Sequence, residues 1–186
     1  LYIQPKLDGV RCLIQADFGI VVDPSHIKAY SRTGKEWKNI NHILKELIPF
    51  FQKYPNVILD GELYNHDLKD DFEKIISLVR KTKPTDEDRL ESAEKVQFHC
   101  YDVIFDNHEE VDYYHRKTFI GDNLFYGHKT VRTIPSHIVR DTEEIEVWHE
   151  EFLERGYEGS IIRKNEPYEC KRSWTLIKVK DFSDAE

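Results

Sequence analysis

The sequence lacks methionine altogether, has three cysteines, and has no long apolar run. Cys12, Cys100 and Cys170 are far apart and form no CxxC pair. This pattern predicts free thiols in a reducing compartment and argues against a disulfide framework or a zinc site. No stretch approaches the roughly 20 apolar residues of a membrane-spanning helix, and no secretory leader is evident. We therefore expect an intracellular protein of the cytoplasm or nucleoid that does not attach to membranes, with a viral or phage origin left open.

Even position 1 is not methionine, so we treat the sequence as a fragment of a longer chain. Its 186 residues allow one large domain or two small ones, and 39% hydrophobic with 33% charged residues is typical of a globular protein. The net charge of −8 argues against nucleic-acid binding by bulk electrostatics. A local basic groove is still compatible with this charge, because the distribution of charge decides.

Hydrophobic periodicity divides the chain into strands and helices. Residues 71–81 and 141–156 have helical periodicity, and Asp141, Glu144 and Gly156 supply capping signals for the second of these helices. A further helix is expected over 39–51, and a solvated loop or short exposed helix over 81–95. Strands are expected over 1–9, 10–16, 19–23, 27–32, 56–65, 95–105, 157–164 and 174–180. Because the strands cluster instead of alternating with helices, we predict an α+β fold with antiparallel strands.

Five short stretches place charged residues in strands that otherwise have a buried pattern. They are KLDGVR (6–11), SRTG (31–34), DGE (60–62), YEGSIIRK (157–164) and LIKVK (176–180). An unpaired buried charge is costly, and each stretch alone is compatible with a solvated edge or a glycine turn. Residues two apart on a strand share a face, so Lys178 and Lys180 should point one way and Ile177 and Val179 into the core. The order and spacing of all five stretches indicate one shared site.

These stretches resemble the adenylation domain of ATP-dependent DNA ligases, in the covalent nucleotidyltransferase superfamily that also holds RNA ligases and mRNA capping enzymes. KLDGVR resembles motif I (KxDGxR), SRTG the arginine-bearing turn after it, LDGELY motif III, FHCYDVIF motif IIIa, YEGSIIRK motif IV and LIKVK motif V. The resemblance implies an ATP-grasp-like nucleotidyltransferase fold, with antiparallel sheets flanked by helices and a nucleotide pocket between them. It also implies an adenylation domain over 1–180, and over 181–186 the start of a linker to an OB-fold domain that lies outside this sequence.

By this resemblance Lys6 is the nucleophile that attacks the α-phosphate of ATP, expels pyrophosphate and forms lysyl-AMP. An amine attacks only in its unprotonated form. Neighbouring cations, namely Arg11, Lys178, Lys180 and a divalent metal, would favour that form and stabilise the charge that develops on the phosphate.

The other roles follow motif by motif. Glu62 would bind the ribose hydroxyl, with Asp60 supporting the same turn. Tyr101 would stack on the adenine, and Ile162, or as second choice Ile161, would cover its other face. The full set implied is Lys6, Asp8, Arg11, Lys178 and Lys180 as catalytic residues; Gln4, Pro5, Lys6, Arg11, Arg32, Glu62, Tyr101, Glu158, Ile162, Lys178 and Lys180 as ATP-binding residues; and Glu62 and Glu158 as Mg²⁺ ligands.

The predicted function is an ATP-dependent DNA ligase that transfers AMP to the 5′-phosphate of nicked DNA and seals the nick. The alternatives are an RNA ligase, a GTP-dependent capping enzyme and a non-catalytic nucleic-acid-binding module, while an NAD-dependent ligase is disfavoured. The expected partners are nicked double-stranded DNA and the OB-fold domain of the same parent chain, and we expect a monomer. Alone, this chain should bind ATP, adenylylate itself slowly and hold nicked DNA weakly.

Overall fold

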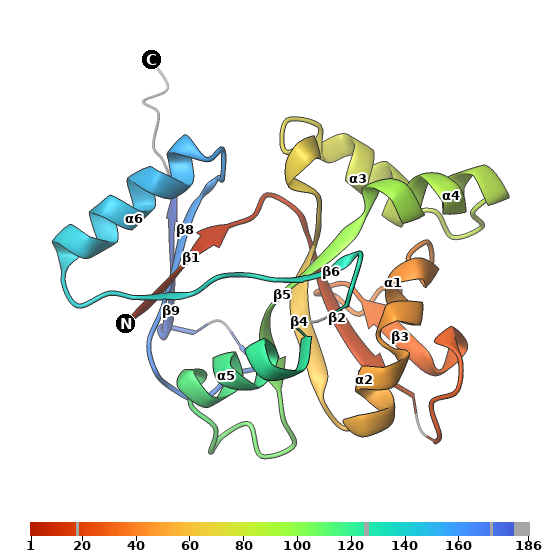
Figure 1. Ribbon diagram of the computed structural model, residues 1–186, viewed down its shortest axis with the longest axis horizontal. Coiled ribbons are helices and arrows are strands. Elements are labelled where there is room, and N and C mark those ends of the chain that lie inside the picture. The colour runs from red at the N-terminus through yellow and green to blue at the C-terminus, as the bar shows by residue number, and fades with distance from the viewer. Residues whose placement is uncertain (18, 125–126, 172, 181–186) are drawn as a thin grey trace.

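The computed structural model describes residues 1–17, 19–124, 127–171 and 173–180, so the linker expected over 181–186 lies outside the described residues. The strands form two sheets (Figure 1). The smaller sheet has the order β7-β1-β8-β9, made of His137–Ile138, Tyr2–Lys6, Gly159–Arg163 and Leu176–Lys180. The larger sheet has the order β3-β2-β4-β5-β6, made of Ile27–Tyr30, Val10–Ala16, Ile58–Tyr64, Gln97–Ile104 and Val131–Thr133. Neighbouring strands pair antiparallel, as predicted, except for the parallel pair β5–β6.

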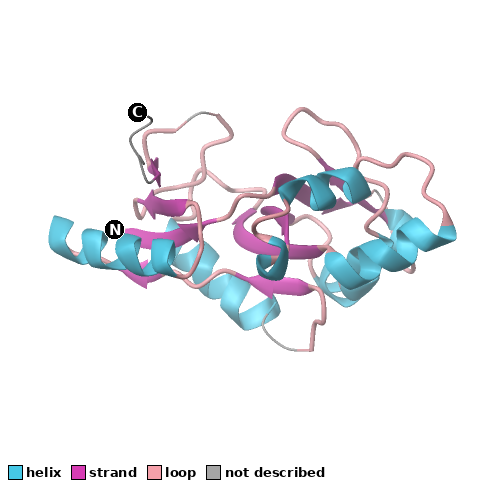
Figure 2. Ribbon diagram, turned by 90° about the horizontal axis from the view of Figure 1, so that it is seen from above, coloured by secondary structure: helices cyan, strands magenta, loops and turns pink. Residues whose placement is uncertain are grey.

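The helices flank these sheets, as Figure 2 shows from above. Helix α6 (Thr142–Glu154) lies against the smaller sheet, and Phe152 packs there with Ile3, Val139 and Ile162. A larger core forms between the second sheet and its helices. The remaining helices are α1 (Asn41–Glu46), α2 (Ile48–Lys53), α3 (Phe72–Val79), α4 (Asp86–Lys95) and α5 (Tyr113–Leu124), with 3₁₀ turns η1 (Pro24–His26) and η2 (His66–Leu68). None of the helices in the described part of the chain is long and apolar enough to cross a membrane.

Most predicted elements are confirmed, and the exceptions have local causes. The helix expected over 39–51 is divided between α1 and α2 because Pro49, which has no N–H to donate, starts a new first turn. Residues 19–23 form no strand, since Ile20 and Val22 are exposed and only Val21 is buried. The polar stretch 81–95 contains α4, which begins at a capping box between Thr85 and Asp88. Helix α5 and strands β6 and β7 were not predicted.

The caps predicted for α6 are largely confirmed. The Asp141 side chain accepts a hydrogen bond from the Glu144 backbone N–H, and Gly156 ends the helix with φ of +86°. The Glu144 carboxylate accepts from the backbone N–H of Arg140, however, and not from that of Asp141. Because Gly156 leads through Tyr157 to Glu158, the end of α6 fixes the start of the fourth motif.

Strand alternation gives the smaller sheet one apolar and one polar face. Ile3 pairs in register with Ile162, and both pack under α6. Gln4 and Lys6 therefore lie on the opposite face. The chain leaves β1 at Lys6 and enters β2 of the larger sheet at Val10, so the first motif joins the two sheets.

Candidate active site

Lys6 and Lys180 converge on one carboxylate at the edge of the smaller sheet. Lys6, Gly159 and Lys180 are aligned in register across β1, β8 and β9, and Glu158 immediately precedes Gly159. Lys6 Nζ forms an ion pair with Glu158 Oε2, and Lys180 Nζ lies 2.5 Å from Glu158 Oε1. Partial burial acts to raise the pKa of the Glu158 carboxyl, but the hydrogen bonds from Lys180 and Lys6 outweigh burial and lower it. The carboxylate is thus held charged between two ammonium groups.

The larger sheet contributes a second ion pair. Arg11 on β2 donates from Nε to Asp60 Oδ1 (3.1 Å) and from Nη2 to Asp60 Oδ2 (2.9 Å). Burial alone would lower the pKa of Arg11, but the buried Asp60 carboxylate raises it, so Arg11 stays charged. A β-bulge between Asp60 and Gly61 lets the strand pass close to β5, where a Cβ on Gly61 would come within 2.3 Å of the His99 carbonyl oxygen. A larger residue at position 61 would therefore displace the strand between Asp60 and Glu62.

Glu62 is half-buried beside these charges, and one of its carboxylate oxygens is buried. Its Oε2 has no hydrogen-bond partner among the residues that the structure describes. Burial, reinforced by Asp60, raises the pKa of the Glu62 carboxyl to about 8, although Lys6, Arg11 and Lys178 oppose the shift. A buried polar atom without a partner is unusual in a folded protein and suits a ligand hydroxyl that would supply the missing hydrogen bond.

The raised pKa of Glu62 predicts a pH-dependent stability. Below about pH 4.5 the carboxyl is neutral in both states, whereas between pH 4.5 and about 8 it ionises in the unfolded chain before it does so in the folded protein. The stability due to neutral Glu62 is therefore complete at low pH and is lost as the pH rises to about 8. We expect Glu62→Gln to remove a loss of up to about 4 kcal/mol in the free energy of unfolding across this range.

Urea denaturation at several pH values measures this effect. Glu150→Gln, which changes an exposed carboxylate on α6, should keep the wild-type pH dependence. Parallel pH profiles for wild type and Glu62→Gln would show that Glu62 is not held neutral by burial.

Other cations gather on the same side. Burial and the charge of Lys6 lower the pKa of Lys178, with contributions from Arg11 and Arg32. Arg32 is exposed in the turn 31–34, and Asp8 is exposed between β1 and β2. The structure thus brings together the basic residues of the KLDGVR, SRTG and LIKVK stretches. On β9, Val179 packs toward the core as expected, but Ile177 is 50% exposed, because β9 is an edge strand and its face there is not fully covered by α6.

Gln4 and Tyr101 line a cavity of about 280 Å³ between the sheets, together with residues of α5 and of the 133–137 segment. Gln4 is 2% exposed, and its Oε1 accepts a hydrogen bond from Arg163 Nε (2.7 Å). The Arg163 guanidinium lies 5.3 Å from the centroid of the Tyr101 ring. Tyr101, which is predicted to stack on the adenine, and Gln4, which is predicted to bind ATP, therefore border one space.

Two predicted nucleotide contacts are wrong. Ile162 packs with Ile3 and Phe152 under α6, so its side chain cannot cover a base on the opposite face. Pro5 is buried and lies on the Ile3 face by alternation, so its ring also points away from Lys6. Ile161, the second choice, is half-buried and lies in register between Gln4 and Lys178, on the site face.

A buried network behind the site was missed. Asp102 accepts hydrogen bonds from Arg116 Nε (2.7 Å) and Nη2 (3.2 Å) and from Arg163 Nη1 (3.0 Å). Tyr168 donates from its hydroxyl to Asp60 Oδ2 (2.6 Å). Arg163 is a charged residue within the strand of the YEGSIIRK stretch, and it was the one detectable sign of this network in the sequence. Arg116 and Tyr168 come from α5 and from the β8–β9 connection, which carry no such pattern.

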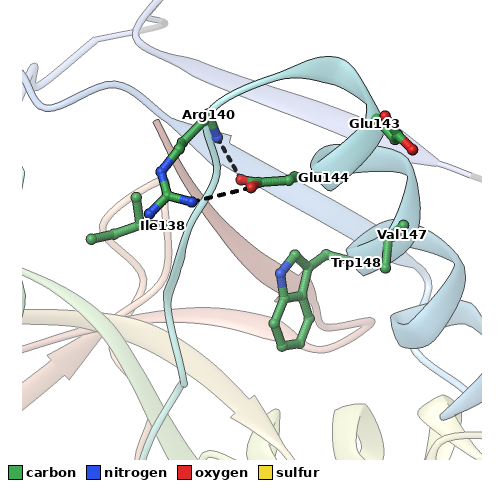
Figure 3. Close-up of a pocket in the computed structure, with 6 residues that line it drawn as sticks. All are labelled: Ile138, Arg140, Glu143, Glu144, Val147 and Trp148. Atoms are coloured by element: carbon green, nitrogen blue, oxygen red, sulfur yellow. Dashed lines mark hydrogen bonds and ion pairs between the residues drawn. The ribbon is translucent and has the colours of Figure 1, made fainter.

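A second hollow of about 340 Å³ lies beside α6 (Figure 3). It is lined by Ile138, Arg140, Glu143, Glu144, Val147 and Trp148, and the Arg140 guanidinium pairs with Glu144 there. Because α6 covers the face of the smaller sheet opposite Lys6, this hollow is outside the candidate active site.

The carboxylates do not form a ready metal cage. Among the residues that the structure describes, no three His, Cys, Asp or Glu side chains are grouped so as to hold a metal ion. Glu62 and Glu158 alone fit Mg²⁺ only in the way common for this ion, with one or two carboxylates completed by substrate phosphates and water.

Solved structures share this arrangement of sheets and helices. A structure named Pmar-Lig_PreS3 has a TM-score of 0.70 at 22% identity over 97% of this chain and 42% of that one. Chlorella virus DNA ligase-adenylate has a TM-score of 0.65 at 22% identity over 96% of this chain and 60% of that one. An archaeal ATP-dependent RNA ligase has a TM-score of 0.57 at 15% identity over 89% of this chain and 40% of that one. The fold is that of the nucleotidyltransferase domains of ligases, which confirms the predicted fold class.

Sequence comparison identifies the family within the proteins that share this fold. A DNA ligase of African swine fever virus (isolate Pig/Kenya/KEN-50/1950) is 28% identical over 99% of this chain and 42% of its own length. A probable DNA ligase of Dictyoglomus turgidum is 26% identical over 96% of this chain and 30% of its own length. The family model of the ATP-dependent DNA ligase domain matches residues 1–180, and the chain belongs to this family. It spans less than half of the length of these two relatives.

Proposed function

We propose that this chain is the adenylation domain of an ATP-dependent DNA ligase and that Lys6 is its nucleophile. The Lys6 amine attacks the α-phosphorus of ATP, the bond to the β-phosphate oxygen breaks, and pyrophosphate leaves, so that AMP is joined to Nζ. The 5′-phosphate of nicked DNA then attacks the same phosphorus and releases Lys6. Finally the 3′-hydroxyl attacks the activated 5′-phosphate, seals the nick and releases AMP.

One observation supports this proposal above the others: Lys6 lies among cations next to a buried oxygen of Glu62 that has no partner in the described part of the chain. Lys178, whose pKa is lowered by burial and by the charge of Lys6, would neutralise the α-phosphate and the charge that develops on it during attack. Attack requires Lys6 to leave its ion pair with Glu158, which can then remain with Lys180.

The remaining residues would hold the nucleotide. Glu62 would donate or accept a hydrogen bond with a ribose hydroxyl, while Tyr101 and Ile161 would contact the base beside Gln4. Arg32, exposed and free to reach outward, would bind the 5′-phosphate of the nick. Asp8 and Arg11 would support the phosphate side. Mg²⁺, held by Glu62 or Glu158 with phosphate oxygens, would neutralise charge on the triphosphate.

The domain limits and partners follow from the family. We take 1–180 as the adenylation domain and expect an OB-fold domain in the parent chain, a monomeric state and an intracellular location. The sequence similarity that supports the OB-fold domain covers the adenylation domain alone. Because we expect the OB-fold domain to take part in the first step, this chain by itself should form lysyl-AMP more slowly than with that domain joined.

Labelling with α-labelled nucleotides tests the proposed function. We expect ATP, and not GTP or NAD⁺, to give a label that survives denaturation and is removed by acid. Chasing the labelled protein with nicked DNA that bears a 5′-phosphate should move the label to the DNA. Labelling by GTP would indicate a capping enzyme, and transfer only to nicked RNA would indicate an RNA ligase. ATP binding without any label would point to a binding module.

A further inference from the structure

The connection between β8 and β9 crosses from the smaller sheet to the larger one and is anchored there. Asn165 Oδ1 accepts a hydrogen bond from the Tyr114 backbone N–H (2.7 Å), and Asn165 Nδ2 donates to Asp112 Oδ2 (3.0 Å). The Glu166 carbonyl accepts from Arg116 Nη1 (2.9 Å). The first residues after β8 are therefore fixed against the N-terminal turn of α5.

This anchoring brings the Tyr168 hydroxyl onto the Arg11–Asp60 pair. The hydroxyl donates to Asp60 Oδ2 (2.6 Å) and accepts from Arg11 Nη2 (3.0 Å). The Tyr168 ring packs against Arg116, whose guanidinium lies 5.7 Å from the ring centroid. Tyr168, Asp60 and Arg11 thus form a closed triangle in which each hydrogen bond has a donor and an acceptor of the correct kind.

The triangle fixes two of the three guanidinium nitrogens of Arg11. Nε and Nη2 donate to Asp60, and Nη2 also donates to Tyr168, while Nη1 makes no hydrogen bond to the described residues. The Arg11 side chain is 37% exposed, whereas that of Asp60 is 3% exposed. Burial and the Asp60 charge raise the pKa of Tyr168, so its hydroxyl keeps its proton at neutral pH and remains a donor.

We propose that Tyr168 is a positioning residue that holds the Arg11 guanidinium with Nη1 directed at the bound nucleotide. The inference rests on the proposed function for its reaction, but the geometry of the triangle stands apart from it. Since a guanidinium is planar, fixing Nε and Nη2 also fixes the direction of the Nη1 hydrogens. Without the Tyr168 hydroxyl, Asp60 loses a donor and the guanidinium can tilt.

Tyr168→Phe tests the proposal, because it removes the hydroxyl and keeps the ring on Arg116. We expect the single-turnover rate of lysyl-AMP formation to fall by about 10-fold, because the hydrogen bonds of the Tyr168 hydroxyl to the charged Asp60 and Arg11 side chains are lost. ATP affinity should change by less than about 2-fold. Tyr54→Phe is the matched control: its hydroxyl donates to Asn123 Oδ1 (2.8 Å) at the α2–α5 contact, away from the site, and its rate should stay at the wild-type value.

A double-mutant cycle separates positioning from general stability. In an Arg11→Lys background, which lacks the planar fork, Tyr168→Phe should slow the reaction by less than about 2-fold. A full 10-fold loss in both backgrounds would show that Tyr168 acts independently of Arg11 and would overturn the proposal. An unchanged rate in Tyr168→Phe would overturn it as well.

A spectroscopic readout decides the geometry even if the protein transfers no AMP. The Arg11 Nε–H resonance, assigned by its loss in Arg11→Lys, should shift and exchange faster with water in Tyr168→Phe but not in Tyr54→Phe. Absence of label in the wild type with this NMR change would refute the proposed function alone. An Arg11 resonance that is the same in wild type and Tyr168→Phe would refute the positioning role.

Discussion

Replacing Lys6 by arginine is expected to lower the rate of covalent AMP attachment by at least about 10⁴-fold. Arginine keeps the positive charge and can pair with Glu158, but a guanidinium does not lose its proton at neutral pH and cannot serve as the nucleophile. The loss therefore isolates nucleophilicity from charge. The measurement is single-turnover labelling with α-labelled ATP.

Lys83→Arg, at an exposed position in the α3–α4 connection, is the control and should label at the wild-type rate. Binding of ATP to Lys6→Arg should persist, because the other phosphate and base contacts remain. Labelling of Lys6→Arg within 10-fold of wild type would show that another residue carries the AMP.

The second large effect concerns stability. Asp102→Asn is expected to lower the free energy of unfolding by about 3–5 kcal/mol, because it leaves Arg116 and Arg163 charged and buried without their shared carboxylate. Both side chains are less than a tenth exposed, so water cannot replace the carboxylate. Urea denaturation at constant pH measures this change.

Glu151→Gln is a suitable control for Asp102→Asn. It breaks the exposed pair between Glu151 and Arg155 on α6 and should cost less than about 0.5 kcal/mol. Equal effects of the two substitutions would mean that the Asp102 network contributes no more than a surface ion pair.

Much of the site could be predicted because its residues lie on strands. Period-2 alternation places Gln4 and Lys6 on one face of β1, and the resemblance to the ligase motifs predicted that Glu158 and Lys180 belong to the same site as Lys6, where the structure has them. The same rule, applied with the register, separates Ile161 from Ile162. The resemblance implied Ile162 with Ile161 as the second choice, and strand register, which cannot be read from one strand alone, was not available to decide between them.

The missed features depend on contacts distant in sequence. Arg116 and Asp102 are 14 residues apart, and Tyr168 and Asp60 are 108 apart. Helix α5 has no clear amphipathic stripe, because Arg116 is buried among its apolar residues by pairing with Asp102. A buried charge that is paired through tertiary structure interrupts the apolar pattern of its helix, so hydrophobic periodicity does not predict that helix.

The central claim is that AMP becomes attached to Lys6, and peptide mapping by mass spectrometry after incubation with ATP and Mg²⁺ tests it most directly. We expect one adduct with the mass of an AMP moiety, on the peptide that contains Lys6, and its removal when pyrophosphate is added. An adduct on a different residue, or no adduct in protein that binds ATP and retains its fold, would contradict attachment of AMP to Lys6.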